Sequence, residues 1–341
     1  MHDLYTFDDD IFNRKIIADN LTSILEEQKM PISISIDSYW GSGKTTFIKK
    51  WMNDLNKHGN KTLYLDAWEY DYNHEPIIPI IGTLENVLKL DKAKKADFTK
   101  AFKTVVFELV KTYSLGVDLE KISSTFDSIE RSDLATFKNL EKEKEVIKKA
   151  LAEYSNDQKV YFFIDELDRC KPLFSIKLLE RIKHFLDVNN FIFIFAVDLQ
   201  QLGMSVKSVY GEINTESYFR KFFDFNFHLP QPEAIKYFEF LFKSNNLEEI
   251  WLEKYVQNTA DLIINKSDIG LRECEKIFNT IRICNNKISK SSSNYYIFPI
   301  LLIFKVLDPE NYKRLLNNDF VFNKEVLSEY VKSTLEFADL F

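Results

Sequence analysis

Five short runs of β-branched and aromatic residues, separated by longer stretches with helical periodicity, are the feature that most restricts the fold of this chain. The runs occupy residues 32–37, 62–66, 160–164, 191–197 and 222–229. The third and fourth are apolar without alternation, which is typical of strands buried on both faces. Strands that alternate with helices form parallel sheets covered by helices. We therefore expect an α/β fold with a five-stranded parallel sheet between layers of helices.

The spacing of these runs indicates a core, an insertion and a C-terminal helical region. At about 150 residues per domain, the 341 residues correspond to about two domains. About ninety residues separate the second run from the third, far more than an ordinary loop contains. Their pattern is compatible with helix, so we expect a helical insertion over about residues 76–155. Because Pro230 and Pro232 end the fifth run, the expected core covers residues 1–231. An all-helical lid and C-terminal region is expected over residues 232–341.

The composition favours a protein of the cytoplasm. Asp and Glu outnumber Lys and Arg by 52 to 45, and the net charge of −7 argues against general coating of nucleic acid. A local basic groove is still compatible with this charge. Three cysteines make no disulfide framework, as expected in a reducing compartment. The N-terminus lacks the order of a signal peptide, and the longest apolar run, Tyr295 to Phe304, is shorter than the ~20 residues of a membrane-spanning helix. We expect a soluble, cytoplasmic protein without membrane contact.

Glycine is concentrated in a segment that has the pattern of a phosphate-binding loop. The chain has only 8 glycines, and Gly41 and Gly43 lie within IDSYWGSGKTT, residues 36–46, between the first run and a helical stretch. Glycine lets backbone N–H groups approach phosphate oxygens, and the following helix presents its positive N-terminal end to the same anion. Lys44 would reach the β- and γ-phosphates, and the Thr45 hydroxyl would bind Mg²⁺. The predicted nucleotide-binding residues of this segment are Ser38, Tyr39, Trp40, Gly41, Ser42, Gly43, Lys44, Thr45 and Thr46.

The match to the Walker A pattern G-x-x-x-x-G-K-[ST] has one departure, because Ser38 stands where the first glycine belongs. If that position requires left-handed backbone, serine costs about 1–2 kcal/mol relative to glycine. The alternative interpretation is an ordinary strand-to-helix turn that contains Gly-Lys-Thr. A second motif is needed to decide between the two.

Paired carboxylates at the end of the third run supply that second motif, of the Walker B type. The sequence FFIDELDR, Phe162–Arg169, places Asp165 and Glu166 at the C-terminal edge of a central strand, where ligands bind in open parallel sheets. Asp165 would hold Mg²⁺ directly or through water. Glu166 would orient or deprotonate the water that attacks the γ-phosphate, and Asp168 could share that work. Alternatively, these acids cap a helix that starts near Pro172, but a phosphate loop 121 residues earlier lets one chemistry explain both motifs.

With these two motifs the chain resembles the KAP family of P-loop NTPases, whose core topology is similar to that of AAA+ ATPases. The segments that carry the resemblance are WGSGKT at 40–45, DAW at 66–68, IDELDRCKP at 164–172, IFAVD at 194–198, YFRKF at 218–222 leading to Leu229 and Pro230, and LRECEKIFN at 271–279. They span roughly residues 10–310. Family members often carry transmembrane helices between the two nucleotide motifs, whereas here that interval is rich in charge.

The resemblance implies further site residues. Asp198 ends the fourth run, where similar ATPases place a polar residue that senses the γ-phosphate; its alternative role is to cap the following helix. Arg220 precedes the fifth run, where AAA+ relatives keep an arginine that reaches a neighbouring subunit's nucleotide. Lys221 is the rival for that role, and an exposed structural pair is the alternative. Arg272 stands where relatives have a lid arginine that contacts phosphate, with a surface ion pair as the alternative. The expected catalytic residues are Glu166, Lys44, Asp198 and Arg220.

The resemblance implies a Mg²⁺-dependent ATPase, with ATP and Mg²⁺ as cofactors, in which hydrolysis drives a conformational or assembly switch. Bacterial members of this family are associated with phage exclusion, so it implies an ATPase subunit of an antiviral defence system. Such a subunit would assemble with itself when ATP binds and would act with an effector protein encoded elsewhere. Phe12 and Arg14 would lie beside the adenine. Two alternatives are a nucleotide-gated scaffold with little hydrolysis and an oligomeric ATPase stimulated by DNA.

Overall fold

The fold was obtained as a computed structural model. It describes residues 5–28, 30–73, 75–87, 98–101, 103–105, 133–185, 188–245, 270–285, 305 and 309–316. The chain divides into two compact units. The first consists of residues 1–8, 14–38 and 44–229, and the second of residues 9–13, 39–43 and 230–341. The second unit thus includes two short pieces from the N-terminal part of the chain.

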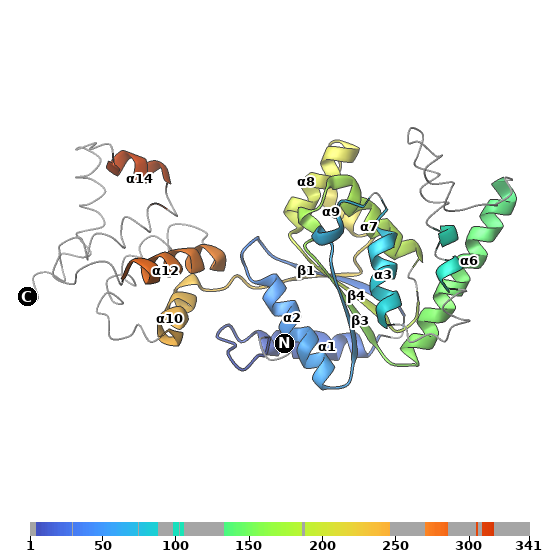
Figure 1. The fold of residues 1–341 in the computed structure, drawn as a ribbon, viewed down its shortest axis with the longest axis horizontal. Helices are drawn as coiled ribbons and strands as arrows, with labels where there is room; N and C mark the ends of the chain where they lie inside the picture. The colour runs from blue at the N-terminus through green and yellow to red at the C-terminus, as the bar shows by residue number, and fades with distance from the viewer. Residues whose placement is uncertain are drawn as a thin grey trace, which may run out of the picture. The chain divides into compact units, whose positions relative to one another are not determined.

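The first unit alternates strands and helices (Figure 1). Its elements are α1 (Arg14–Glu26), β1 (Ile32–Asp37), α2 (Lys44–Lys57), β2 (Lys61–Asp66), η1 (Trp68–Tyr70), α3 (Ile77–Val87), α6 (Asp133–Ser155), β3 (Val160–Asp165), η2 (Leu167–Arg169), α7 (Pro172–Phe185), β4 (Phe191–Val197), α8 (Leu199–Tyr210), α9 (Thr215–Phe219) and β5 (Phe225–His228). The helices of the second unit are α10 (Ala234–Ser244), α12 (Leu271–Asn285) and α14 (Pro309–Leu316). The predicted α/β fold is confirmed.

All neighbouring strands of the sheet are parallel, in the order β2-β3-β4-β1-β5. The register brings the last residues of the strands within one position of each other, because Asp165 pairs with Asp66 on one side and with Ala196 on the other. Asp37 likewise pairs with Val197. The carboxyl ends of the four longer strands therefore meet along one edge, where a parallel sheet binds its ligands.

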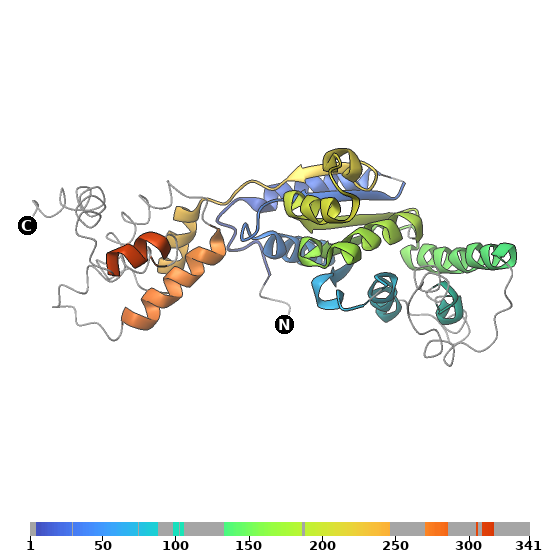
Figure 2. The same cartoon turned by 90° about the horizontal axis from the view of Figure 1, so that it is seen from above.

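Helices cover both faces of this sheet (Figures 1 and 2). Successive side chains of a strand point to opposite faces. On β3, Phe163 packs with α1 and α2, while Phe162 packs with α7 and α8 on the other face. β3 and β4 are buried at every position, which explains their uninterrupted apolar sequences. The face of the sheet that packs against α7 and α8 also packs against α3 and against the Ile147 and Leu151 side chains of α6.

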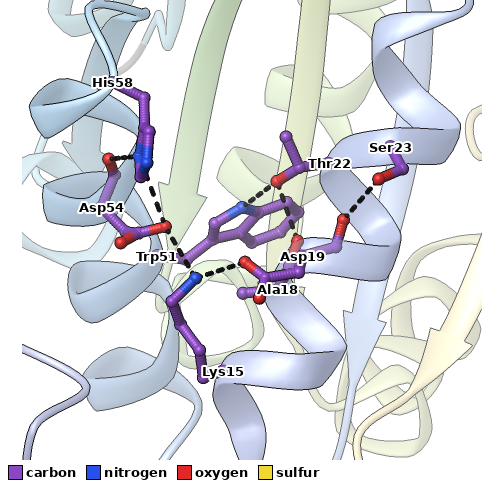
Figure 3. A network of polar contacts seen from close by, with 8 residues as sticks. All are labelled: Lys15, Ala18, Asp19, Thr22, Ser23, Trp51, Asp54 and His58. Carbon is purple, nitrogen blue, oxygen red and sulfur yellow. Dashed lines mark hydrogen bonds and ion pairs between the residues drawn. The ribbon is translucent and has the colours of Figure 1, made fainter.

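A hydrogen bond and an ion pair join α1 to α2 (Figure 3). The indole Nε1 of Trp51 donates a hydrogen bond of 2.8 Å to the hydroxyl of Thr22. The ammonium of Lys15 lies 3.4 Å from a carboxylate oxygen of Asp54 and 2.5 Å from one of Asp19. Trp51 itself is fully buried against Phe163 of β3, with ring centroids 5.4 Å apart. These contacts hold α2, the helix that follows the phosphate loop, against the sheet.

The predicted fifth strand is partly wrong. It begins at Phe225 rather than 222, because Phe222 and Phe223 lie in a turn after α9, where both amides donate hydrogen bonds to the carbonyl of Phe219. The two rings still pack into the core, but from this turn. Sequence periodicity cannot distinguish these cases, since a strand and a tight turn can both bury aromatic residues.

Two other predictions fall partly outside the described residues. Within the expected insertion, the structure describes α3, residues 98–101 and 103–105, and α6. The apolar run Tyr295 to Phe304 lies outside the described residues entirely. None of the helices in the described part of the chain has the length and apolarity required to span a bilayer.

Candidate functional site

Lys44, the first residue of α2, lies among carboxylates at the carboxyl ends of the strands. Its ammonium is buried and interacts electrostatically with Asp168, Asp198, Asp165 and Asp37. Burial lowers the pKa of Lys44, while the four carboxylates oppose that shift. The structure thus brings the lysine of the glycine-rich segment together with the acids of the third strand, the juxtaposition on which the sequence interpretation depends.

Two glycines of the loop before Lys44 adopt a backbone conformation that other residues rarely adopt. Gly41 and Gly43 have φ of 82° and 84°, a left-handed conformation that favours glycine. Ser38 is not among the described residues with left-handed backbone, so the expected strain at this position does not arise. The carbonyl of Ser38 accepts a 2.5 Å hydrogen bond from the Lys44 ammonium. Its hydroxyl is buried and has no hydrogen-bond partner among the described residues, which leaves it available to a ligand.

Within the second unit, the same loop contacts the start of α12. The amide of Leu271 donates a 2.9 Å hydrogen bond to the carbonyl of Gly41. The backbones are so close that a Cβ on Gly270 would lie 3.3 Å from the Cα of Gly41. Arg272, the predicted lid arginine, is exposed and follows Leu271 directly.

Asp165 is held by three hydrogen bonds. Its carboxylate accepts one from the Thr45 hydroxyl, one of 3.1 Å from the Tyr64 hydroxyl and one of 2.9 Å from the amide of Glu166. Burial raises the pKa of Asp165, and the three hydrogen bonds oppose that shift. Thr45 and Asp165 are the two predicted Mg²⁺ ligands, so the structure places both at one point. Tyr64 was not predicted, although its position two residues before the end of β2 is a signal that could have been used.

Glu166 follows with an unusual backbone. Its φ of 57° and ψ of 25° are left-handed, which is rare for a glutamate. Burial and the charge of Asp165 raise the pKa of Glu166, while Arg169 lowers it. A carboxylate oxygen of Glu166 lies 2.5 Å from the Nε of Arg169. The Glu166 side chain makes no capping bond to η2, the short helix that directly follows it.

Asp168 and Asp198 connect the ends of β3 and β4. The carboxylate of Asp168 is buried and accepts a 3.1 Å hydrogen bond from the amide of Asp198. The carboxylate of Asp198 caps α8, accepting from the amides of Gln200 and Gln201 at 3.0 and 3.1 Å. The capping alternative for Asp198 is therefore realised, and its proximity to Lys44 leaves the predicted sensing role as a proposal.

Asp37 is a site residue that the sequence analysis missed. One carboxylate oxygen accepts a 2.9 Å hydrogen bond from the amide of Leu199, and the other lies 3.3 Å from Nδ1 of His228. It thereby joins β1 to the start of α8 and the end of β5. The signal was available, because Asp37 is the last residue of a strand that leads directly into the glycine-rich loop.

The structure does not connect Arg220 with these residues by any described contact. Arg220 ends α9, its side chain is 69% exposed, and it forms a 2.7 Å ion pair with Glu216. Lys221 lies with its ammonium 5.7 Å from the ring centroid of Tyr218. The exposed-pair alternative is thus what a single chain shows. Phe12 belongs to the second unit, where its ring lies 6.2 Å from that of Tyr237, whereas the buried Arg14 begins α1.

Comparison with known proteins identifies the family. Residues 14–288, most of the 341, match the KAP family P-loop domain. The chain belongs to the KAP family. It is therefore a P-loop NTPase, and the predicted family is confirmed. No match was found among curated proteins.

Several solved structures are similar to this KAP protein at low sequence identity. The ORC2 protein of Aeropyrum pernix, in ADPNP and ADP complexes, is 13% identical with a TM-score of 0.46; the match covers 87% of this chain and 68% of that one. Domain III of the replication initiation protein DnaA of Thermotoga maritima is 12% identical with a TM-score of 0.42, covering 89% and 98%.

Proposed function

We propose that this KAP protein binds ATP together with Mg²⁺ and hydrolyses it to drive a conformational switch. One observation carries the proposal: the buried ammonium of Lys44 lies among four carboxylates, one of which is hydrogen-bonded to Thr45. An anion-binding loop and a cation-binding acid at the same point match the two charges of a nucleotide–metal complex.

The donor set suits Mg²⁺. This ion prefers oxygen ligands and is usually bound through one or two carboxylates together with water and substrate phosphates. Asp165 and the Thr45 hydroxyl are oxygen donors already within hydrogen-bond contact of each other. Burial makes the charge of Asp165 costly, so a cation beside it would relieve that cost. When bound, Mg²⁺ would neutralise charge on the β- and γ-phosphates.

The protein's own residues would perform the remaining steps. Backbone N–H groups of the loop and the positive end of α2 would bind the phosphates, and the Lys44 ammonium would contact the γ-phosphate. A water oxygen would bond to the γ-phosphorus while the bond to the β–γ bridging oxygen breaks, and Glu166 would accept the water's proton. Asp198 is close enough to Lys44 to respond to the γ-phosphate.

The second unit offers a route for the switch. The carbonyl of Gly41 accepts a hydrogen bond from the amide of Leu271. Loss of a phosphate from the loop would therefore change the contacts of the first turn of α12. In this proposal Arg272, next in sequence, contacts the phosphate and fixes α12 when ATP is bound. Ordering and release of a bonded segment is a common form of nucleotide switch.

We extend the proposal to assembly and biological role. The exposed guanidinium of Arg220 is accessible to a neighbouring subunit, which supports ATP-dependent self-assembly with Arg220 acting on the neighbour's nucleotide. Membership of the KAP family supports an ATPase subunit of an antiviral defence system that acts with an effector protein. Light scattering with and without ATP and Mg²⁺ tests the assembly. In phosphate release, the Arg220→Ala variant is expected to bind ATP but to hydrolyse it slowly.

Steady-state phosphate release tests the hydrolytic function. Lys44→Ala is expected to abolish ATP binding, seen as loss of the thermal stabilisation that ATP and Mg²⁺ give the wild type; at a hundredfold excess over Kd this amounts to about 2.7 kcal/mol. Glu166→Gln is expected to keep that stabilisation and lose phosphate release. The exposed Lys57 at the end of α2 and Glu212 after α8 provide matched controls, Lys57→Ala and Glu212→Gln.

A nucleotide-gated scaffold is the second candidate, and one observation favours it. The carboxylate of Glu166 is ion-paired with Arg169, and a carboxylate held in an ion pair is a weaker proton acceptor. Equal, slow phosphate release by wild type and Glu166→Gln would support the scaffold and contradict the hydrolytic function.

A further inference from the structure

Glu166 lies in a short segment whose geometry is fixed at several points. Its left-handed backbone, with φ of 57°, is rare for a residue other than glycine, asparagine or aspartate, and such strained residues cluster at functional sites. The segment continues as η2, in which the carbonyl of Leu167 accepts a 2.8 Å hydrogen bond from the buried hydroxyl of Ser175 on α7. The amide of Arg169 donates a 3.2 Å hydrogen bond to the carbonyl of Glu166. The backbones of Glu166 and Arg169 are therefore fixed relative to each other.

The side chains of the same two residues form a close ion pair. Nε of Arg169 lies 2.5 Å from Oε2 of Glu166, and the two side chains are 22% and 17% exposed. Pairing at three residues' separation needs no distant partner, because the 3₁₀ turn brings the two side chains to one side. The pair is sheltered enough that the solvent screening typical of surface salt bridges is reduced.

An aromatic ring covers the guanidinium. The Cζ of Arg169 lies 5.7 Å from the centroid of the Trp68 ring, a cation–π contact. The turn that carries Trp68 is attached to the same strand end, since the amide of Ala67 donates a 2.9 Å hydrogen bond to the carbonyl of Asp165. Asp66 accepts a further hydrogen bond of 3.1 Å from the Trp68 amide. Trp68 is 53% exposed, which is unusual for a tryptophan, a residue that is mostly buried on average.

We infer that Arg169 is a positioning residue for Glu166: supported by the Trp68 ring, it holds Oε2 and leaves Oε1 as the oxygen that meets the attacking water. The inference rests on the proposed hydrolytic function. A glutamate side chain with free torsions would place its carboxylate in several orientations, and general-base catalysis needs one of them. The strained backbone and the ion pair together select that one.

The test compares kcat and KM for ATP in four variants. Arg169→Gln is expected to lower kcat about tenfold, a part of the usual contribution of a general base. Its KM and its thermal stabilisation by ATP and Mg²⁺ should stay close to those of the wild type. Arg169→Lys, which keeps the positive charge, should recover most of kcat. Trp68→Ala should fall between wild type and Arg169→Gln. Lys171→Gln, an exposed charge in the next turn, is the matched control and should leave kcat unchanged.

Combination with Glu166→Gln separates positioning from other roles. If Arg169 acts through Glu166, Arg169→Gln should cause no further loss of kcat in a Glu166→Gln background. In thermal unfolding without ATP, the Tm change of the double variant should differ from the sum of the two single changes. Additive losses of kcat, an unchanged kcat in Arg169→Gln, or KM and kcat falling together would each overturn the inference.

Failure of the proposed function would look different. In that case wild type and Glu166→Gln release phosphate at the same rate, whichever residue occupies position 169. That result removes the base and with it the inference. A large difference between wild type and Glu166→Gln, with Arg169→Gln equal to wild type, overturns the role of Arg169 alone.

Discussion

Two tyrosine hydroxyls on neighbouring strands have opposite surroundings, and removing each should have the opposite effect on stability. The Tyr64 hydroxyl donates a 3.1 Å hydrogen bond to the carboxylate of Asp165. The Tyr161 hydroxyl is buried and has no hydrogen-bond partner among the described residues. Both substitutions, Tyr64→Phe and Tyr161→Phe, delete one oxygen and keep the ring, so the change in shape is matched.

The magnitudes follow from these surroundings. A hydrogen bond to a charged group contributes about 1.5–3 kcal/mol, and we take the lower end, about 1.5 kcal/mol, because Tyr64 is partly exposed. A buried polar group without a partner costs about 1–3 kcal/mol, so Tyr161→Phe should stabilise the protein by about 1 kcal/mol. In urea unfolding, Tyr64→Phe should lower the midpoint and Tyr161→Phe should raise it.

Nucleotide affinity provides a second readout. If the Tyr64 hydroxyl fixes the carboxylate that holds Mg²⁺, loss of about 1.4 kcal/mol corresponds to a tenfold weaker affinity for Mg²⁺–ATP. Calorimetric titration should show this for Tyr64→Phe and no change for Tyr161→Phe. Midpoints that shift in the same direction, or equal affinities in the two variants, would refute the reasoning from these contacts.

The remaining predictions concern a buried ion pair, two glycines and a buried acid. Glu75 and Arg181 form a double hydrogen bond at 2.8 and 3.1 Å and are 2% and 6% exposed, so Glu75→Gln should cost about 3–5 kcal/mol in urea unfolding; a cost below 1 kcal/mol would contradict this. Gly270→Ala, with its Cβ 3.3 Å from the phosphate-loop backbone, should weaken ATP binding, whereas Gly82→Ala on α3, with open space around it, should stabilise the fold by roughly 0.5–1 kcal/mol. Burial raises the folded-state pKa of Asp165, so its ionisation opposes folding above that pKa and costs nothing below the unfolded value of about 4. Asp165→Asn should therefore raise Tm at pH 7, by less as the pH falls towards 4, and should abolish Mg²⁺-dependent phosphate release; a Tm gain independent of pH would be inconsistent with this.

The sheet could be predicted because its signals are local and strong. The apolar runs 160–164 and 191–197 have no polar face, so only a strand buried on both sides suits them. The fifth strand was predicted too long because Phe222 and Phe223 bury their rings from a turn. An aromatic residue in the sequence indicates a buried side chain, but it does not indicate whether the backbone there is a strand or a turn.

The meeting of Lys44 with Asp165 could be predicted because parallel strands end at one edge. The register that places Asp66 opposite Asp165, and Asp37 one position further along the sheet edge, follows from the pairing of strands, which a single sequence does not reveal. The bonds of Asp37 to Leu199 and of Tyr64 to Asp165 depend on that register, so both residues were missed. Sequence motifs thus located the chemistry, and tertiary structure supplied the residues that hold it in place.

The left-handed backbone of Glu166 lies beyond sequence reasoning. Asparagine and glycine are the residues that favour this conformation, and a glutamate gives no local signal for it. In the structure the next residue, Leu167, accepts a hydrogen bond from the Ser175 hydroxyl on α7, a contact that no local sequence pattern indicates. Family membership likewise gives no information on the stacking of Trp68 on Arg169, which only the coordinates show.

A crystal structure with Mg²⁺ and a non-hydrolysable ATP analogue would examine the site in one measurement. We expect the γ-phosphate within hydrogen-bond distance of the Lys44 ammonium, and the metal coordinated by the Thr45 hydroxyl and by Asp165, directly or through water. Glu166 should face the γ-phosphate with Oε2 still on Arg169. A nucleotide bound away from Lys44, or a metal without contact to Thr45 and Asp165, would contradict the account.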